Sequence, residues 1–255
     1  RNVKTIKRPT RSIGLSALSL ARFSHYFEHL LDALANPVMA WLPNLLSTAA
    51  TAATISLFAS PWKTMQAIKL GHSSTTTVPV LPYLSTCFQC VLWALYGITV
   101  SNPAVCFVNT VGTVLSAYFI STYYVHAKLK EDVQKKILML VGILSLVIGY
   151  VRLIVVEHLR AKYLGTIASV GTIVMFGSPL SAMATVIQTR STESMPLIVS
   201  ILSAVASFLW TSYGMLIDDY YVAVPNGLGF VLALAQLLVL FLYGGPQQAA
   251  TSSVI

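Results

Sequence analysis

The chain has 255 residues, of which 56% are hydrophobic and only 9% are charged. Soluble domains carry roughly 25% charged residues, so this composition excludes a water-facing globular surface and predicts that lipid surrounds the protein. The net charge of +8 does not indicate nucleic-acid binding, because the basic residues collect near the start of the chain and in short loops.

Residues 1–46 are predicted to form a basic N-terminal extension. Six Lys and Arg residues precede the first acid, Glu28. Basic, serine-containing stretches without acids resemble transit peptides or amphipathic helices on a membrane surface. We expect this part of the chain to be loosely ordered.

Seven apolar stretches follow, each near the roughly 20 residues that a helix needs to cross a bilayer. The predicted helices are Trp41–Ala67, Pro82–Val100, Pro103–His126, Ile137–Val156, Tyr163–Gln188, Pro196–Ile217 and Tyr221–Tyr243. These stretches are too long and too continuous for the strands of a membrane barrel. The predicted fold class is therefore an all-α membrane protein with seven transmembrane helices.

The first three and the last three predicted helices are copies of one another. The pattern Leu-Trp-x-x-Tyr-Gly occurs twice, and the two occurrences are 117 positions apart. The aligned segments are 92–97 with 209–214, Asn109 with Asn226, Gly112 with Gly229 and, at a spacing of 118, 58–61 with 176–179. An internal repeat of this length predicts that each copy is one structural unit.

The basic residues orient the two copies. The loops after the second and sixth helices contain no Lys or Arg, whereas the loops after the first, third and fifth helices and their flanks do. The positive-inside rule places the basic loops in the cytoplasm, with the N-terminus outside and the C-terminus inside. Both copies then run in the same direction, so the fourth helix must link them in a 3+1+3 arrangement. The predicted divisions are 1–46 (extension), 47–126 (first repeat), 127–162 (linker with the fourth helix), 163–243 (second repeat) and 244–255 (C-terminal tail).

The sequence contains no recognisable catalytic or metal-binding constellation. It lacks a Gly-rich phosphate loop, HExxH and G-x-S-x-G, and its three cysteines are too few for a disulfide framework. We therefore expect no enzyme activity, no cofactor and no metal. All eight acids lie outside the centres of the predicted helices. Since an intramembrane carboxylate is the usual sign of proton or sodium coupling, this distribution favours passive transport.

Trp93 and Asn109 in the first copy, and Trp210 and Asn226 in the second, are the candidate substrate-binding residues. Each tryptophan lies about 10–12 Å, and each asparagine about 8–9 Å, inside the end of its helix at 1.5 Å per residue. Because the helices of each pair are antiparallel, Trp and Asn lie at similar depth and are predicted to face one central space. An indole packs on the C–H face of a sugar ring and offers one N–H, while an amide offers donors and an acceptor to hydroxyl pairs.

Prolines and tyrosines occupy further matched positions. A proline inside a helix removes a backbone hydrogen bond and permits a bend, so symmetric bends would let the two halves rock around the site. The candidate hinge residues are Pro61, Pro82, Pro179 and Pro196, of which the second and fourth lie in first turns, where helix initiation explains a proline equally well. The candidate outer gate consists of Tyr96, Tyr213 and Asp219.

These residues carry a resemblance to the SWEET (MtN3/saliva) sugar transporter family over about residues 50–243. The motifs in the second copy are Ser-Pro-Leu-Ser at 178–181, Ser-Thr-Glu-Ser-Met-Pro at 191–196, Trp-Thr-Ser-Tyr-Gly at 210–214 and Pro-Asn-Gly-Leu-Gly at 225–229. The motifs in the first copy are Ser-Pro at 60–61, Leu-Pro-Tyr at 81–83, Trp-Ala-Leu-Tyr-Gly at 93–97 and Asn-Thr-Val-Gly at 109–112. The resemblance implies a passive sugar uniporter with a 3+1+3 bundle. It also implies that the two asparagines bind the sugar, that the tryptophans pack on its ring and that the four prolines are hinges.

The expected function is bidirectional passive transport of a mono- or disaccharide by alternating access, with the plasma membrane as the expected location and an endomembrane as the alternative. The expected partners are the sugar and the bilayer, without nucleic acid, and a homo-oligomer is left open. One alternative is a PQ-loop-type amino-acid transporter, which would place Gln after the hinge proline, where Trp62 and Leu180 stand here. The other is a seven-helix binding protein that does not transport, against which the tandem repeat speaks.

Overall fold

The computed structural model describes residues 41–244, so most of the predicted extension and nearly all of the C-terminal tail lie outside the described residues. The chain divides into two units, Arg1–Leu45 and Leu46–Ile255, and the second contains every contact discussed below. A first helix covers residues 41–59. It is followed by α2 (Trp62–Lys69), α3 (Leu81–Thr99), α4 (Pro103–His126), α5 (Lys130–Gly149), the π-helix η1 (Tyr150–Ile154), α6 (Glu157–Met175), α7 (Gly177–Thr189), α8 (Leu197–Leu216) and α9 (Tyr220–Tyr243).

The seven-helix membrane fold predicted from composition is confirmed. The described residues form seven helical stretches that are long and apolar enough to span a bilayer, and no strand occurs among them. The predicted bounds of the second, third, sixth and seventh helices agree with α3, α4, α8 and α9 to within a residue.

The first and fifth spans are each interrupted within or beside the repeated Phe-x-Ser-Pro motif. The 41–59 helix stops at Ser60, whose N–H bonds to the Leu57 carbonyl at 3.0 Å. In the second copy Phe176 separates α6 from α7, and its N–H bonds to the Ile173 carbonyl at 3.1 Å. A proline follows each break, and its missing N–H prevents the regular hydrogen-bond ladder from continuing.

Two predicted helix starts were wrong. The α5 helix begins at Lys130 rather than Ile137, and α6 begins at Glu157 rather than Tyr163. Charged residues that were predicted to lie in loops therefore form the first turns of these helices. The reason is that acids occupy the first turn of both helices, where the partial positive charge of the helix N-terminus stabilises them.

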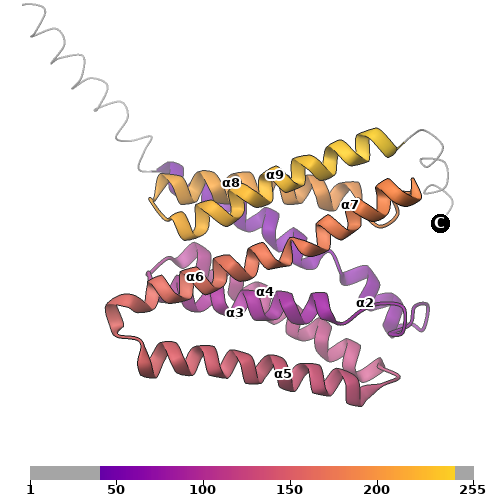
Figure 1. Cartoon of the computed structure of the whole chain (residues 1–255), viewed down its shortest axis with the longest axis horizontal. Coiled ribbons are helices and arrows are strands. Elements are labelled where there is room, and N and C mark those ends of the chain that lie inside the picture. The colour runs from indigo at the N-terminus through magenta and orange to yellow at the C-terminus, as the bar shows by residue number, and fades with distance from the viewer. Residues whose placement is uncertain (1–40, 245–255) are drawn as a thin grey trace, which may run out of the picture. The chain divides into compact units, whose positions relative to one another are not determined.

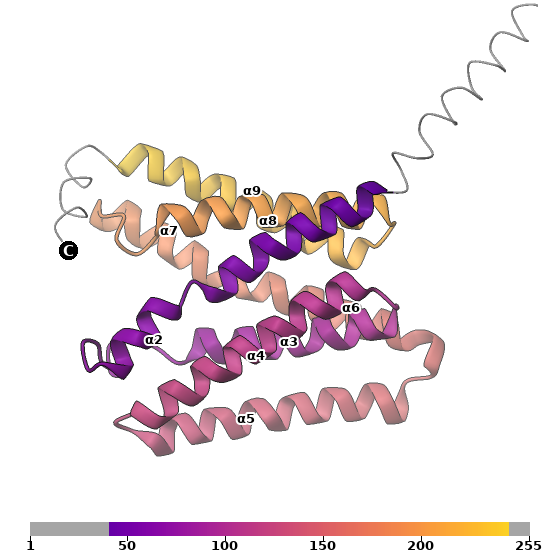
Figure 2. The same ribbon diagram turned by 180° about the vertical axis from the view of Figure 1, so that it is seen from behind.

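The helices pack as two related groups (Figures 1 and 2). The α3 helix packs on α4 and, in the second copy, α8 packs on α9. The α6 helix contacts α3 of the first copy and α9 of its own copy, so it joins the two groups. The linker α5 lies at one edge beside α4, and Val133 is its only buried residue. Lipid is therefore the natural surrounding of α5.

The turns that connect the paired helices repeat in detail. Asn102 caps α4 by accepting a hydrogen bond from Val105 N at 3.1 Å, and Asp219 caps α9 by accepting one from Val222 N at 3.2 Å. The residue before each cap has a positive φ, 54° at Ser101 and 55° at Asp218. The copies thus share backbone conformation as well as sequence, and the matched caps place the side chains that follow them at matched depths.

Candidate functional site

A cavity of about 520 Å³ lies between the two copies, and all four predicted binding residues line it. Most lining residues occur in matched pairs. These pairs are Trp93 and Trp210, Asn109 and Asn226, Thr54 and Thr172, Leu57 and Met175, Ser60 and Ser178, Thr86 and Ser203, Cys90 and Ser207, and Val105 and Val222. Because aligned residues of the two copies line the cavity, its wall has an approximate twofold symmetry.

The two tryptophans are held by the opposite copy. Trp93 donates its indole N–H to Thr172 Oγ1 at 3.1 Å, and Trp210 donates to Thr54 Oγ1 at 2.9 Å. The indole N–H that sequence analysis assigned to the substrate is thus already bonded to protein. What each indole presents to a substrate is its ring.

The threonines that hold the tryptophans are themselves fixed. The Thr54 hydroxyl donates to the Ala50 carbonyl at 2.8 Å, and the Thr172 hydroxyl donates to the Ala168 carbonyl at 3.0 Å. With its proton directed along its own helix, each threonine oxygen can only accept from other groups. This pair was not among the predicted site residues, although the two threonines align at the same spacing of 118 as the Phe-x-Ser-Pro motif.

The two asparagines are oriented by their own helices. Asn109 Nδ2 donates to the Val105 carbonyl and Asn226 Nδ2 to the Val222 carbonyl, both at 2.8 Å. Each amide keeps one N–H and its carbonyl oxygen for other partners. The asparagines therefore do not bond between helices, and a donor and an acceptor remain at each position.

The wall of this cavity is uncharged. Among the described residues that line it there is no Asp, Glu, Lys, Arg or His, and the lining consists of hydroxyl, amide, indole, sulfur-containing, phenyl and aliphatic side chains. Such a surface offers hydrogen bonds and apolar contact but no counter-ion. It fits a neutral polyol better than an amino acid, whose two charges would require partners in the dry interior.

The predicted gate residues meet in two crossed hydrogen bonds at one end of the bundle. The Tyr96 hydroxyl donates to Asp219 Oδ1 at 2.8 Å, and the Tyr213 hydroxyl donates to Asn102 Oδ1 at 3.1 Å. Each tyrosine thus reaches the helix cap of the other copy and joins the two copies beside the cavity. Asn102 was not among the predicted gate residues, although it aligns with Asp219 at the spacing of 117.

The four predicted hinge prolines occupy different positions. Pro61 caps α2, and Pro179 is the third residue of α7 and lines the cavity. Pro82 lies in the first turn of α3, and Pro196 caps α8. Only Pro61 and Pro179 lie at or just after a break within a span, and the hinge role of all four prolines stays a prediction.

A fifth proline, Pro225, lies inside α9 and is fully buried. It cannot donate to the Tyr221 carbonyl, and the Ser169 hydroxyl donates to that oxygen instead, at 3.0 Å. This bond connects α6 to α9 at Tyr221, in the part of α9 that precedes Asn226.

Gln89 is a cavity residue without a polar counterpart in the second copy. It is buried, and its Nε2 donates to the Ala168 carbonyl and to Thr172 Oγ1, both at 2.9 Å. The aligned residue of the second copy is Ala206. A search for repeated residues could not have found Gln89, because it departs from the repeat.

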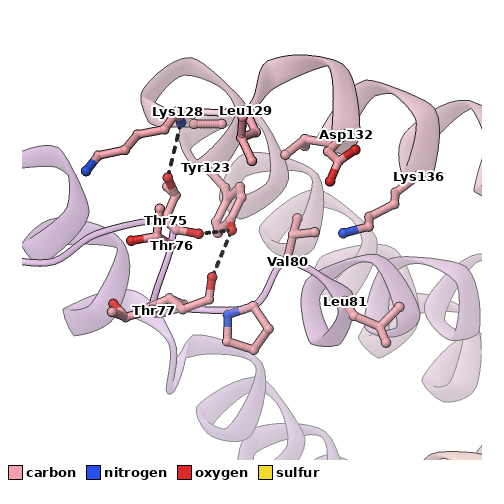
Figure 3. A pocket seen from close by; sticks show the side chains of 14 residues that line it. Thr75, Thr76, Thr77, Val80, Leu81, Tyr123, Lys128, Leu129, Asp132 and Lys136 are labelled. Carbon is pink, nitrogen blue, oxygen red and sulfur yellow. Dashed lines mark hydrogen bonds between the residues drawn. The ribbon is translucent and has the colours of Figure 1, made fainter.

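A second cavity, of about 560 Å³, lies between the segment 75–81 and the start of α5 (Figure 3). Lys128, Asp132 and Lys136 line it together with three threonines, and none of the predicted site residues does. Tyr123 points into this region, where its hydroxyl lies 2.6 Å from the Thr75 carbonyl. The charged lining separates this cavity from the uncharged one between the copies.

Two three-helix copies, a linker helix and an uncharged cavity between the copies define a membrane protein of the repeat-built transporter class. The chain matches the family MtN3_slv, described as "Sugar efflux transporter for intercellular exchange", over residues 44–131 and 162–248. The chain belongs to this family, as its motifs predicted.

Individual relatives agree with this assignment. The chain is 33% identical over 207 residues to the sugar transporter SWEET1 of Dictyostelium discoideum, covering 79% of this chain and 94% of that protein. It is 33% identical over 202 residues to the bidirectional sugar transporter SWEET8 of Arabidopsis thaliana, covering 74% and 83%. A solved structure of a eukaryotic SWEET transporter superimposes with a TM-score of 0.76 at 28% identity, covering 81% of this chain and 99% of that one.

Proposed function

We propose that the protein is a bidirectional, passive sugar transporter that works by alternating access. The observation that carries the proposal is the uncharged cavity in which both tryptophans and both asparagines lie. Membership of a sugar-transporter family supports the same conclusion. Neither the cavity wall nor the family points to an enzyme or to an amino-acid carrier.

The binding chemistry follows from which atoms are already bonded. The indole rings of Trp93 and Trp210 cover the C–H faces of the sugar, since their N–H groups are occupied by threonines. The remaining N–H and the oxygen of Asn109 and Asn226 pair with sugar hydroxyls. When the sugar leaves, these amide groups can form hydrogen bonds to water instead, so binding is reversible from either side.

Movement of the sugar requires the two ends of the cavity to open in turn. One end is closed by Tyr96–Asp219 and Tyr213–Asn102, whose four residues come from both copies. Opening this gate and closing the opposite end is a rocking of the copies about the breaks near Pro61 and Pro179. We place the gate outside the cell, the N-terminus outside and the C-terminus in the cytoplasm, on the distribution of Lys and Arg.

The test is uptake of radiolabelled glucose, sucrose and leucine by liposomes that contain the purified protein. We expect one of the sugars, but not leucine, to equilibrate faster than in empty liposomes, without a proton or sodium gradient. Asn226→Ala should slow uptake, whereas Val224→Ala, on the exposed face of the same helix, should not. Uptake of leucine with no uptake of either sugar would contradict the proposal and favour an amino-acid transporter.

A further inference from the structure

The two copies meet at two junctions that are equivalent in the repeat but differ at one pair of aligned positions. At the α3–α6 junction, Trp93 of the first copy bonds to Thr172 of the second. At the junction between the 41–59 helix and α8, Trp210 of the second copy bonds to Thr54 of the first. A perfectly symmetric protein would separate equally at both junctions when the copies rock.

Gln89 breaks this symmetry. Its amide nitrogen bonds to two acceptors on α6, Ala168 O and Thr172 Oγ1, both at 2.9 Å. The aligned Ala206 on α8 has no group that can make such bonds. Gln89 therefore adds a hydrogen-bonded cross-link between the copies at the α3–α6 junction. The side chain of Ala206 cannot form this cross-link at the other junction.

The two junctions also differ at a second pair of aligned positions, next to the first. A side chain at Gly171 would collide with the Gln89 amide, so the glycine makes room for it. The residue aligned with Gly171 is Ala53, and the residue aligned with Gln89 is Ala206. One junction thus holds a Gln and a Gly at the positions where the other holds two alanines.

The orientation of the amide is fixed by Thr172. Because the Thr172 hydroxyl donates to Ala168 O, both groups that Gln89 meets on α6 are acceptors, and the amide nitrogen must face them. Its oxygen is then buried and has no hydrogen-bond partner among the described residues. An arrangement that leaves a buried oxygen unsatisfied is not explained by stability, since the lost bond offsets what the nitrogen gains.

We propose that Gln89 is a positioning residue that makes the α3–α6 junction the pivot of the transport cycle. The close approach at Gly171 and the bonds to Thr172 keep α3 on α6, and the copies separate at the junction of the 41–59 helix with α8. This inference rests on the proposed alternating access, but flux and pivot position are measured separately.

The experiment compares distances across the two junctions with matched label pairs. Leu81 on α3 and Val174 on α6 report on one junction, and the aligned Ile198 on α8 and Ser56 report on the other; all four are exposed. Spin labels are introduced as unnatural amino acids in the full chain, so that the native cysteines stay. Distances are recorded in lipid vesicles with and without a saturating concentration of the sugar that the flux assay identifies.

We expect the Ser56–Ile198 distance to shift by several ångström and the Leu81–Val174 distance by no more than about 1–2 Å, the size of a helix shift within a packed interface. Gln89→Ala with Gly171→Ala should make the two shifts similar. Ala53→Gly with Ala206→Gln, added to that pair, moves the cross-link to the other junction and should exchange the two shifts.

Equal distance shifts at the two junctions of the unsubstituted protein would overturn the pivot, and so would unchanged distance shifts after the cross-link is moved. Neither result would contradict the proposed sugar transport, which is measured separately. If the fourfold variant does not fold, Gln89→Asn is the second test. Its shorter amide cannot reach both acceptors, so the Leu81–Val174 shift should increase at normal expression. An unchanged shift there likewise overturns the proposal. Loss of flux in the unsubstituted protein would instead contradict the proposed function.

Discussion

Trp210 on α8 donates its indole N–H to Thr54, 156 residues earlier in the chain, at 2.9 Å. Trp93 makes the matching bond to Thr172 in the opposite direction. Each ring that faces the cavity is thus positioned by a helix of the other copy. A movement of the copies that separates the 41–59 helix from α8 would change how the Trp210 ring is held, which couples the shape of the site to the arrangement of the two copies.

The threonine contacts predict a specific pattern of variants. Thr54→Val keeps the side-chain shape but removes the acceptor of the Trp210 N–H, which leaves a buried donor unsatisfied. We expect sugar flux to fall about tenfold, because a misplaced ring loses both packing and orientation. Tryptophan fluorescence should change in parallel. Thr54→Ser retains the oxygen and should behave like the unsubstituted protein; a serine variant as slow as the valine variant would assign the effect to the methyl group.

The two gate bonds predict unequal effects. Tyr96 donates to the carboxylate of Asp219, whereas Tyr213 donates to the neutral amide of Asn102. Hydrogen bonds to charged groups contribute about 1.5–3 kcal/mol, against about 0.5–1.5 kcal/mol for neutral ones. Tyr96→Phe should therefore open the gate more than Tyr213→Phe. Labelling of the native Cys90, which lines the cavity, by a membrane-impermeant thiol reagent measures this opening, and equal labelling of the two variants would contradict the ranking.

The breaks near Pro61 and Pro179 predict slower cycling when the prolines are removed. An alanine restores the missing N–H and lets the helix continue, so the copies become harder to bend. Pro179→Ala should lower the maximal flux more than it changes the half-saturating sugar concentration. Pro103→Ala is the control, because Pro103 only begins α4. A control variant as slow as Pro179→Ala would show that proline loss alone, rather than loss of a break, is responsible.

Glycine substitutions predict opposite effects on stability. A side chain at Gly112 would collide with Cys90 and with the Phe58 ring, so Gly112→Ala should destabilise the protein by about 1–3 kcal/mol through overpacking. Gly142 on α5 has no atom near enough for a new side chain to meet, and Gly142→Ala should be neutral or slightly stabilising. Thermal unfolding in detergent ranks the two, and a lower midpoint for the Gly142 variant would contradict the packing seen here.

Much of the fold could be predicted because lipid and repetition leave strong signals. The apolar stretch Pro103–His126 matches α4 at both ends, since Pro initiates the helix and a charged segment follows it. The start of α5 at Lys130 was missed because charged residues usually indicate loops, whereas acids in a first helical turn are favourable.

The site was partly predictable for the same reason. Trp93, Asn109, Trp210 and Asn226 could be found because they repeat, and the structure brings all four to one cavity. Gln89 could not be found in that way, since its importance lies in a tertiary contact with Gly171 and in the absence of a counterpart. Repetition identifies what the two copies share, and only the packed structure shows where they differ. The roles of these residues in binding sugar stay predictions.

The central claim is that sugar crosses the membrane through the cavity between the copies. Its most direct test is exchange of labelled for unlabelled sugar in liposomes that contain Asn109→Ala with Asn226→Ala, compared with Thr110→Ala on the exposed face of α4. We predict at least a tenfold slower exchange for the double variant, about 1.4 kcal/mol of lost interaction, and no change for the Thr110 variant. Exchange by the folded double variant at the unsubstituted rate would contradict the account.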